Sequence, residues 1–197
     1  MPCILRPLYY CLLLHRIVIF PMTQEERQQI INLVKQEVIP AIGCTEPIAV
    51  ALCVAKATEV LGCRPEKISV FLSANILKNA MGVGIPGTGM IGLPIAVALG
   101  ALIGKSSYQL EVLKDSTPQA VEEGKAYLNE KRISIALKDD CTEKLYVEVV
   151  CEAGSSHSCA IISGEHTRFV YVSKEADVLL KEDVVADASA QEKTLNL

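Results

Sequence analysis

The residues best suited to chemistry lie in two stretches near the middle of the chain. The first stretch is the turn Gly43–Pro47, in which Cys44 directly precedes an apolar helical segment. The positive end of a helix dipole lowers the pKa of a nearby thiol and favours thiolate, the form that a metal ligand or a nucleophile requires. The alternative reading is a small, structural cysteine at a buried turn.

The second stretch runs from residue 75 to residue 92 and is rich in glycine. Backbone N–H groups that lead into a helix suit an anion such as a carboxylate or a phosphate. The alternative is a tight corner that lets a helix pack closely on a strand, and the loop by itself leaves both readings open. Lys78 and Asn79 stand just before the loop, Pro86 stiffens its middle, and Thr88 lies within it between Gly87 and Gly89.

The same loop contains the pattern G-x-G-x-x-G twice, beginning at Gly82 and at Gly87. A dinucleotide site needs a strand immediately before this pattern and an acidic residue about 20 residues later, at the end of the next strand. Several residues separate the expected strand from Gly82, and the nearest following acid, Glu111, falls in an expected loop or helix. The pattern is therefore weak support for dinucleotide binding.

Composition narrows the class of protein. The chain has 197 residues, half of them hydrophobic, and a net charge of −4 without a basic stripe, which argues against a nucleic-acid partner. It has eight cysteines and no C-x-x-C pair, so a zinc ribbon is not indicated. A long aliphatic chain also does not resemble a secreted disulfide framework, so we expect a cytoplasmic protein with reduced thiols.

The first part of the chain is predicted to be helical with one strand. Residues 1–21 are apolar but interrupted by charge, and we interpret them as a spurious N-terminal extension. Residues 22–131 form the predicted site-bearing part. It contains a capped helix over 23–39, a helix from about 45 to 61, a strand over 68–73, an uncharged helix over 93–103 and a helix from 117 to about 131.

The uncharged helix raises the question of a membrane span. No charge occurs from Ile85 to Gly104, and Gly100 and Gly104 form a G-x-x-x-G pattern. The first residues of this stretch belong to the glycine loop, which leaves about a dozen helical positions, fewer than the ~20 that a span needs. We therefore predict a buried core helix, and a helix this apolar needs cover, which predicts self-association as a homo-oligomer.

The second part of the chain reads as β structure. Four strands are predicted within 132–173, forming a small antiparallel accessory lobe, so the fold class is mixed α/β. Cys151, His157 and Cys159 could suggest a metal site, but two ligands and a distant third favour a structural role. Residues 174–197 are polar and acidic and are predicted to be a linker to a missing C-terminal domain.

Several short motifs together resemble one protein family. Gly43-Cys44-Thr45-Glu46-Pro47 is followed by Asn75-x-x-Lys78-Asn79, by the segment from Pro86 to Pro94, by Glu111–Asp115 and by Gly164-x-His166-Thr167. In this order the motifs resemble the N-terminal part of the L-cysteine desulfidase (UPF0597) family, which is related to the alpha chain of iron–sulfur L-serine dehydratases. The resemblance extends from about Met22 to Ser173.

The resemblance implies a lyase that converts L-cysteine, or L-serine in the relatives, to pyruvate and ammonia with loss of sulfide or water. It implies a [4Fe–4S] cluster held by three cysteines, of which Cys44 matches the N-terminal ligand. Lys78, Asn79 and the loop Pro86–Gly89 match the segment near the substrate. The family's other cluster cysteines lie in a C-terminal helical domain, so this chain is expected to be inactive without that domain or a companion subunit.

Three hypotheses follow from the sequence. The first is the iron–sulfur lyase, complete only with a C-terminal partner. The second is a module that binds a small amino acid in a regulatory role, or as a remnant, without catalysis. The third, a pyridoxal phosphate enzyme with Lys78 as the Schiff base, rests on a single lysine beside a glycine loop.

Overall fold

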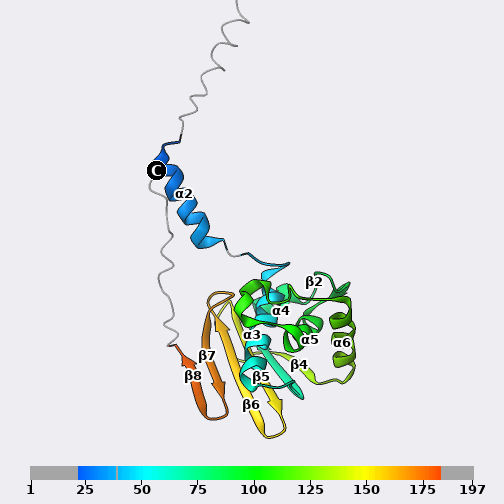
Figure 1. Ribbon diagram of the computed structural model, residues 1–197. Coiled ribbons are helices and arrows are strands. Elements are labelled where there is room, and N and C mark those ends of the chain that lie inside the picture. The colour runs from blue at the N-terminus through cyan, green and yellow to red at the C-terminus, as the bar shows by residue number, and fades with distance from the viewer. Residues whose placement is uncertain (1–21, 39, 183–197) are drawn as a thin grey trace, which may run out of the picture. The chain divides into compact units, whose positions relative to one another are not determined.

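The computed structural model describes residues 22–38 and 40–182 (Figure 1). The chain divides into two compact units, which we describe separately: the first contains residues 22–38 and the second begins at Ile39. The predicted extension over residues 1–21 lies outside the described residues. In the first unit, helix α2 (Gln24–Glu37) begins at the N-cap Thr23, where Thr23 and Glu26 form the predicted capping box.

The second unit is built on one six-stranded sheet. The strand order is β4-β1-β5-β6-β7-β8, and every pair is antiparallel except β1 with β4, which is parallel. The strands are β1 (Lys67–Leu72), β4 (Ile133–Leu137), β5 (Tyr146–Ala153), β6 (Ser156–Ser163), β7 (Phe169–Lys174) and β8 (Asp177–Lys181). A mixed sheet with helices between β1 and β4 confirms the predicted α/β class.

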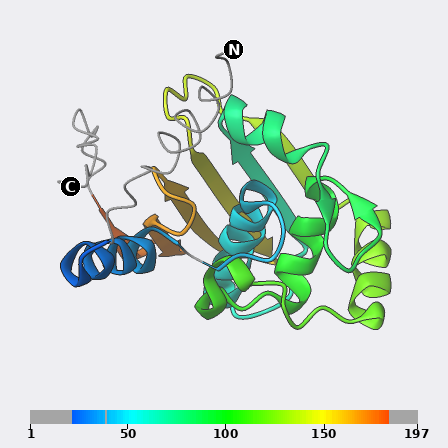
Figure 2. The same cartoon turned by 90° about the horizontal axis from the view of Figure 1, so that it is seen from above.

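The helices form layers against one face of this sheet (Figures 1 and 2). Helix α3 (Thr45–Leu61) packs on β5 and β6, α5 (Leu93–Ile103) packs on α3, and α6 (Pro118–Asn129) packs on α5. The strands turn alternate residues toward α3, such as Ile68 and Val70 in β1 and Val149 in β5, and these side chains are buried. The core is therefore aliphatic, as the composition predicts.

The uncharged helix α5 is covered within the chain. Almost all of its residues from Leu93 to Ala101 are buried between α3 and α6. A methyl group on Gly100 would lie 2.7 Å from the backbone oxygen of Ala51 in α3, so the G-x-x-x-G pattern serves close contact between two core helices. This removes the reason for predicting self-association through α5. Among the described residues, no helix is long and apolar enough to cross a membrane.

The β-rich segment is not a separate lobe. Strand β1 lies between β4 and β5, so residues 132–173 share one sheet with the first part of the chain. Strand β4 is also parallel to β1 and not antiparallel, because the chain crosses over from β1 to β4 through α4, α5 and α6. Residues 174–182 are not a linker: β8 pairs with β7 and closes this side of the sheet.

Candidate functional site

Cys44 directly precedes α3, as predicted, and it occupies the N-cap position itself. Its backbone is extended (φ −75°, ψ 135°) and its side chain does not cap the helix. The rest of α3 is almost continuously buried from Pro47 to Ala55, so the position of its first turn is fixed by the core. The Cys44 side chain itself is only partly buried and lies at the surface end of the helix.

Glu46 connects the side chains around Cys44. The thiol Sγ of Cys44 donates to Oε2 of Glu46 at 3.0 Å, and the Thr45 hydroxyl donates to the same oxygen at 3.2 Å. Asn79 Nδ2 donates to the other oxygen, Oε1, at 3.4 Å. Sequence reasoning did not select Glu46, although an acidic residue in the first turn of a helix beside two donors was a usable signal.

The electrostatics of this cluster contradict the predicted thiolate. Partial burial and then the hydrogen bond to Glu46 raise the pKa of Cys44 above its ordinary value. The hydrogen bond from Cys44 in turn lowers the pKa of Glu46, aided by smaller contributions from Thr45 and Asn79. The pair is therefore a neutral thiol beside an ionised carboxylate, because burial and the hydrogen bond to Glu46 both favour the protonated form of Cys44.

The glycine loop is a short hairpin formed by β2 (Gly84–Ile85) and β3 (Met90–Ile91). Gly87 and Gly89 adopt positive φ values of 76° and 64°, which the turn requires. Thr88 is buried inside the turn: its hydroxyl donates to the Ile85 carbonyl at 2.7 Å and accepts from the Met90 N–H at 3.0 Å. Thr88 therefore closes the loop.

The structure brings the Cys44 turn and the glycine hairpin together. Gly43 has a φ of 91°, and a methyl group there would lie 2.7 Å from Cγ of Pro86. The N–H of Ile42 also donates to the carbonyl of Leu110, which ties the same turn to the segment that precedes α6. The motifs Gly43–Pro47 and Pro86–Pro94 thus meet at the N-terminus of α3, where Asn79 of the Asn75–Asn79 motif also reaches Glu46.

Helix α4 (Ala74–Ala80), which the sequence did not predict, brings Asn79 to this site. It begins where β1 ends, because Ser73 leaves the strand and accepts a hydrogen bond from the Ile76 N–H as N-cap. Lys78 is exposed on the same helix, and within the described chain its side chain makes no hydrogen bond or ion pair. The Gly164–Thr167 turn has no hydrogen bond to the Cys44 cluster in this part of the chain.

The described residues contain no group of three or more histidine, cysteine, aspartate or glutamate side chains that could hold a metal ion. Cys151 in β5 pairs with Ser158 in β6 and is buried on the helix side of the sheet. Cys159 directly follows Ser158 in β6, so its side chain faces the opposite side of the sheet. His157 Nδ1 lies 2.9 Å from a carboxylate oxygen of Glu175. The structural interpretation of these cysteines therefore agrees with their placement.

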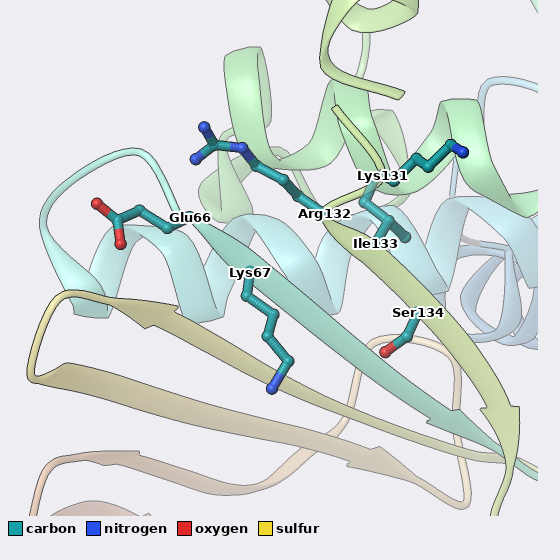
Figure 3. Close-up of a pocket in the computed structure, with 6 residues that line it drawn as sticks. All are labelled: Glu66, Lys67, Lys131, Arg132, Ile133 and Ser134. Carbon is teal, nitrogen blue, oxygen red and sulfur yellow. The ribbon is translucent and has the colours of Figure 1, made fainter. Parts of the chain in front are cut away.

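A hollow of about 250 Å³ lies away from the Cys44 cluster, at the N-terminal ends of β1 and β4. Figure 3 shows that its charged side chains diverge: Arg132 and Lys131 point in opposite directions. Arg132 lies 2.6 Å from Glu130, and Lys67 lies 3.0 Å from Glu152, so these cations already have partners. This hollow does not present a set of converging groups for a ligand.

The fold and the cluster define an α/β protein in which a partly buried cysteine and carboxylate lie beside a glycine hairpin. The chain is similar to UPF0597 proteins, with 73% identity over 176 residues to one from Bacteroides fragilis, 66% to one from Bacteroides thetaiotaomicron and 43% over 153 residues to one from Aeromonas hydrophila. These matches cover 89%, 89% and 78% of this chain, and 41%, 41% and 34% of the relatives. The chain thus spans about two fifths of the relatives' length. No protein-family profile and no solved structure matches it.

Proposed function

We propose that this chain forms the substrate-binding segment of a lyase that acts on L-cysteine or L-serine and is completed by a C-terminal domain or a companion subunit. The observation that carries the proposal is the meeting of three motifs at the N-terminus of α3: Glu46 is bonded to Cys44 and Asn79, and the glycine hairpin lies against Gly43 through Pro86. The similarity to UPF0597 proteins and the resemblance of the same motifs to L-cysteine desulfidases support this choice of reaction.

The proposed substrate contacts follow from charge. A small amino acid carries an ammonium and a carboxylate, and the ionised Glu46 is a partly buried partner for the ammonium. The exposed Lys78 is next to Asn79 in the sequence of α4 and is the cationic candidate for the carboxylate, together with the N–H groups of the hairpin. In this arrangement Asn79 orients Glu46 through its 3.4 Å hydrogen bond.

The described residues do not by themselves fit a [4Fe–4S] cluster. Such a cluster needs three or four thiolates, whereas Cys44 is the one cysteine beside the proposed substrate groups and no three-ligand group exists in the described chain. Cys44 can offer one ligand once metal binding releases its proton, while Glu46 stays ionised as the partner of the ammonium. Any further ligands would come from outside the described residues.

Titration calorimetry of the chain with L-cysteine and L-serine tests the binding step. We expect both ligands to bind, and Glu46→Gln to weaken binding about tenfold or more, because the charged partner of the ammonium is lost. Glu123→Gln, on the exposed face of α6, is the matched control and should bind as the parent does. Equal binding by the two variants would remove Glu46 from the site.

The lyase step is tested in a chimera in which this chain replaces the matched segment of the Bacteroides fragilis relative. Anaerobic assays should detect pyruvate, ammonia and sulfide from L-cysteine, and Cys44→Ser should abolish the activity while the Glu123→Gln variant retains it. If the chimera binds L-cysteine and releases no product from either amino acid, the chain belongs to a binding module. The hydrogen bond that the Cys44 thiol donates to Oε2 of Glu46 at 3.0 Å favours this second function, because it holds the proton on the sulfur.

A further inference from the structure

Strand β4 is the exposed edge of the sheet, and its outward backbone groups can be identified. The Ile68 N–H donates to the Arg132 carbonyl, and the Lys138 N–H donates to the Leu72 carbonyl, so even-numbered residues of this segment face β1. Because the groups alternate along a strand, the N–H and C=O groups of Ile133, Ile135 and Leu137 point away from the sheet. Among the described residues, no strand pairs with this edge.

An apolar groove runs beside the same edge. It has a volume of about 630 Å³. Met81, which lines it, is 52% exposed, and Leu137 at the end of β4 is 50% exposed. Figure 3 shows the Ile133 and Ser134 side chains on opposite sides of β4. The groove is lined by Leu77, Met81, Pro94, Leu128, Lys131, Ile133 and Ile135.

The two ends of β4 carry opposite charge. Lys131 precedes the strand, points away from β1 in Figure 3, and has no ion pair among the described residues. Asp139 and Asp140 follow the strand and are exposed. A long unpaired edge with apolar side chains is a template for pairing with another strand, and its basic and acidic ends select an antiparallel partner with the same charge order.

We propose that β4 pairs with β4 of a second copy of this chain, antiparallel about a two-fold axis at Ile135. This register places Ile133 opposite Leu137 of the other copy and Ile135 opposite itself, so all outward groups meet as hydrogen-bonded pairs. It also brings Lys131 of each copy level with Asp139 of the other, and the two apolar grooves become continuous across the axis.

The same register brings two like-charge pairs level, Arg132 with Lys138 and Glu130 with Asp140 of the other copy, and Arg132, Lys138 and Glu130 each have an ion-pair partner within their own copy. Arg132 would lie opposite Lys138 of the other copy, on the far face of the strand. Arg132 is paired with Glu130 at 2.6 Å, and Lys138 with Glu148 at 2.6 Å. A parallel arrangement would instead place Lys131 beside Lys131 and Asp139 beside Asp139, which has no such compensation.

Sedimentation of the full chain at several concentrations tests the proposal by charge exchange. We expect a dimer. In each single variant, Lys131→Asp or Asp139→Lys, its dissociation constant should rise about tenfold over that of the parent, because two rim ion pairs become repulsive. The double variant should return the constant to that of the parent. Lys125→Asp, on α6, controls for a general effect of charge and should leave the dimer unchanged.

Cross-linking tests the register directly. Residues 134 and 136 of opposite copies form a non-hydrogen-bonded pair with a Cα separation of about 4.5 Å, which a disulfide can span. The double variant Ser134→Cys, Ala136→Cys should form a disulfide between copies, located by mass spectrometry, and Ser134→Cys alone should not. A monomer, a dimer indifferent to the charge exchange, or a dimer without this disulfide overturns the proposal.

Discussion

Two glycines in this molecule each permit a close contact that a larger residue would prevent, one in the core and one at the candidate site. A methyl group at Gly100 would lie 2.7 Å from the Ala51 oxygen, and one at Gly43 would lie 2.7 Å from Cγ of Pro86. Gly100 lies between two core helices whose side chains are buried, whereas Gly43 joins two exposed loops beside an ionised carboxylate. The first contact supports the fold, and the second holds the parts of the candidate site together.

The largest expected effect comes from the core contact. Gly100→Ala should lower the free energy of unfolding by about 2 kcal/mol, because the new methyl group meets a backbone oxygen that cannot move away. The matched control is Gly124→Ala in α6, where the methyl group would meet side chains and no backbone atom: Cδ1 of Ile95 at 3.1 Å and Cδ2 of Leu99 at 3.3 Å. Because alanine has a higher helix propensity than glycine, the unfolding free energy of that variant should stay close to that of the parent. Urea unfolding of both variants distinguishes a backbone contact from general helix packing.

The site contact should have a smaller effect on stability and a larger one on binding. Gly43→Ala places alanine at a φ of 91° and against Pro86, which should cost about 1.5 kcal/mol of unfolding free energy. Binding of L-cysteine should also weaken, because the hairpin is displaced from Cys44. The double variant Gly43→Ala, Pro86→Ala should recover part of both losses, since it removes the contact and leaves the strained φ. Full additivity of the two single variants would mean that the loops do not touch.

A buried hydroxyl links the core to the sheet without involving the site. Tyr127 is fully buried, and its hydroxyl donates to the Pro65 carbonyl at 2.7 Å. Burial raises the pKa of Tyr127 to about 12. Tyr127→Phe should lower the unfolding free energy by about 1 kcal/mol, because the Pro65 carbonyl loses its partner, and it should leave amino-acid binding unchanged. A change in binding would show that the two regions are coupled.

The sequence predicted the core better than the site, for physical reasons. The helix over Leu93–Ile103 and the Thr117 cap could be located because burial and capping leave local patterns. Strand β8 was missed because its exposed Val178 and Leu179 show no alternation with a buried face. The sheet order was missed because β1 and β5 are paired across a long stretch of chain. Glu46 was missed because its partners, Cys44 and Asn79, meet only after folding.

The smallest expected effect concerns the Glu46 carboxylate, the charge that is present beside Gly43 and absent around Gly100. Replacing Glu46 by glutamine removes a negative charge and a hydrogen-bond acceptor beside the thiol, so the pKa of Cys44 should fall toward its ordinary value. Alkylation of Cys44, followed by mass spectrometry, should then begin at lower pH than in the parent. Glu123→Gln should not shift the profile.

Glu46 also predicts the direction of the stability change with pH. Its pKa is lower in the folded chain than in the unfolded chain, so its contribution to stability is present above the unfolded pKa and is lost as pH falls through the folded pKa. In Glu46→Gln the unfolding free energy should therefore decline less between about pH 5 and pH 3 than in the parent. Gly100→Ala leaves this carboxylate intact, so its pH dependence should parallel that of the parent at lower stability. Identical acid profiles for the parent and Glu46→Gln would show that the Cys44–Glu46 hydrogen bond does not persist in solution.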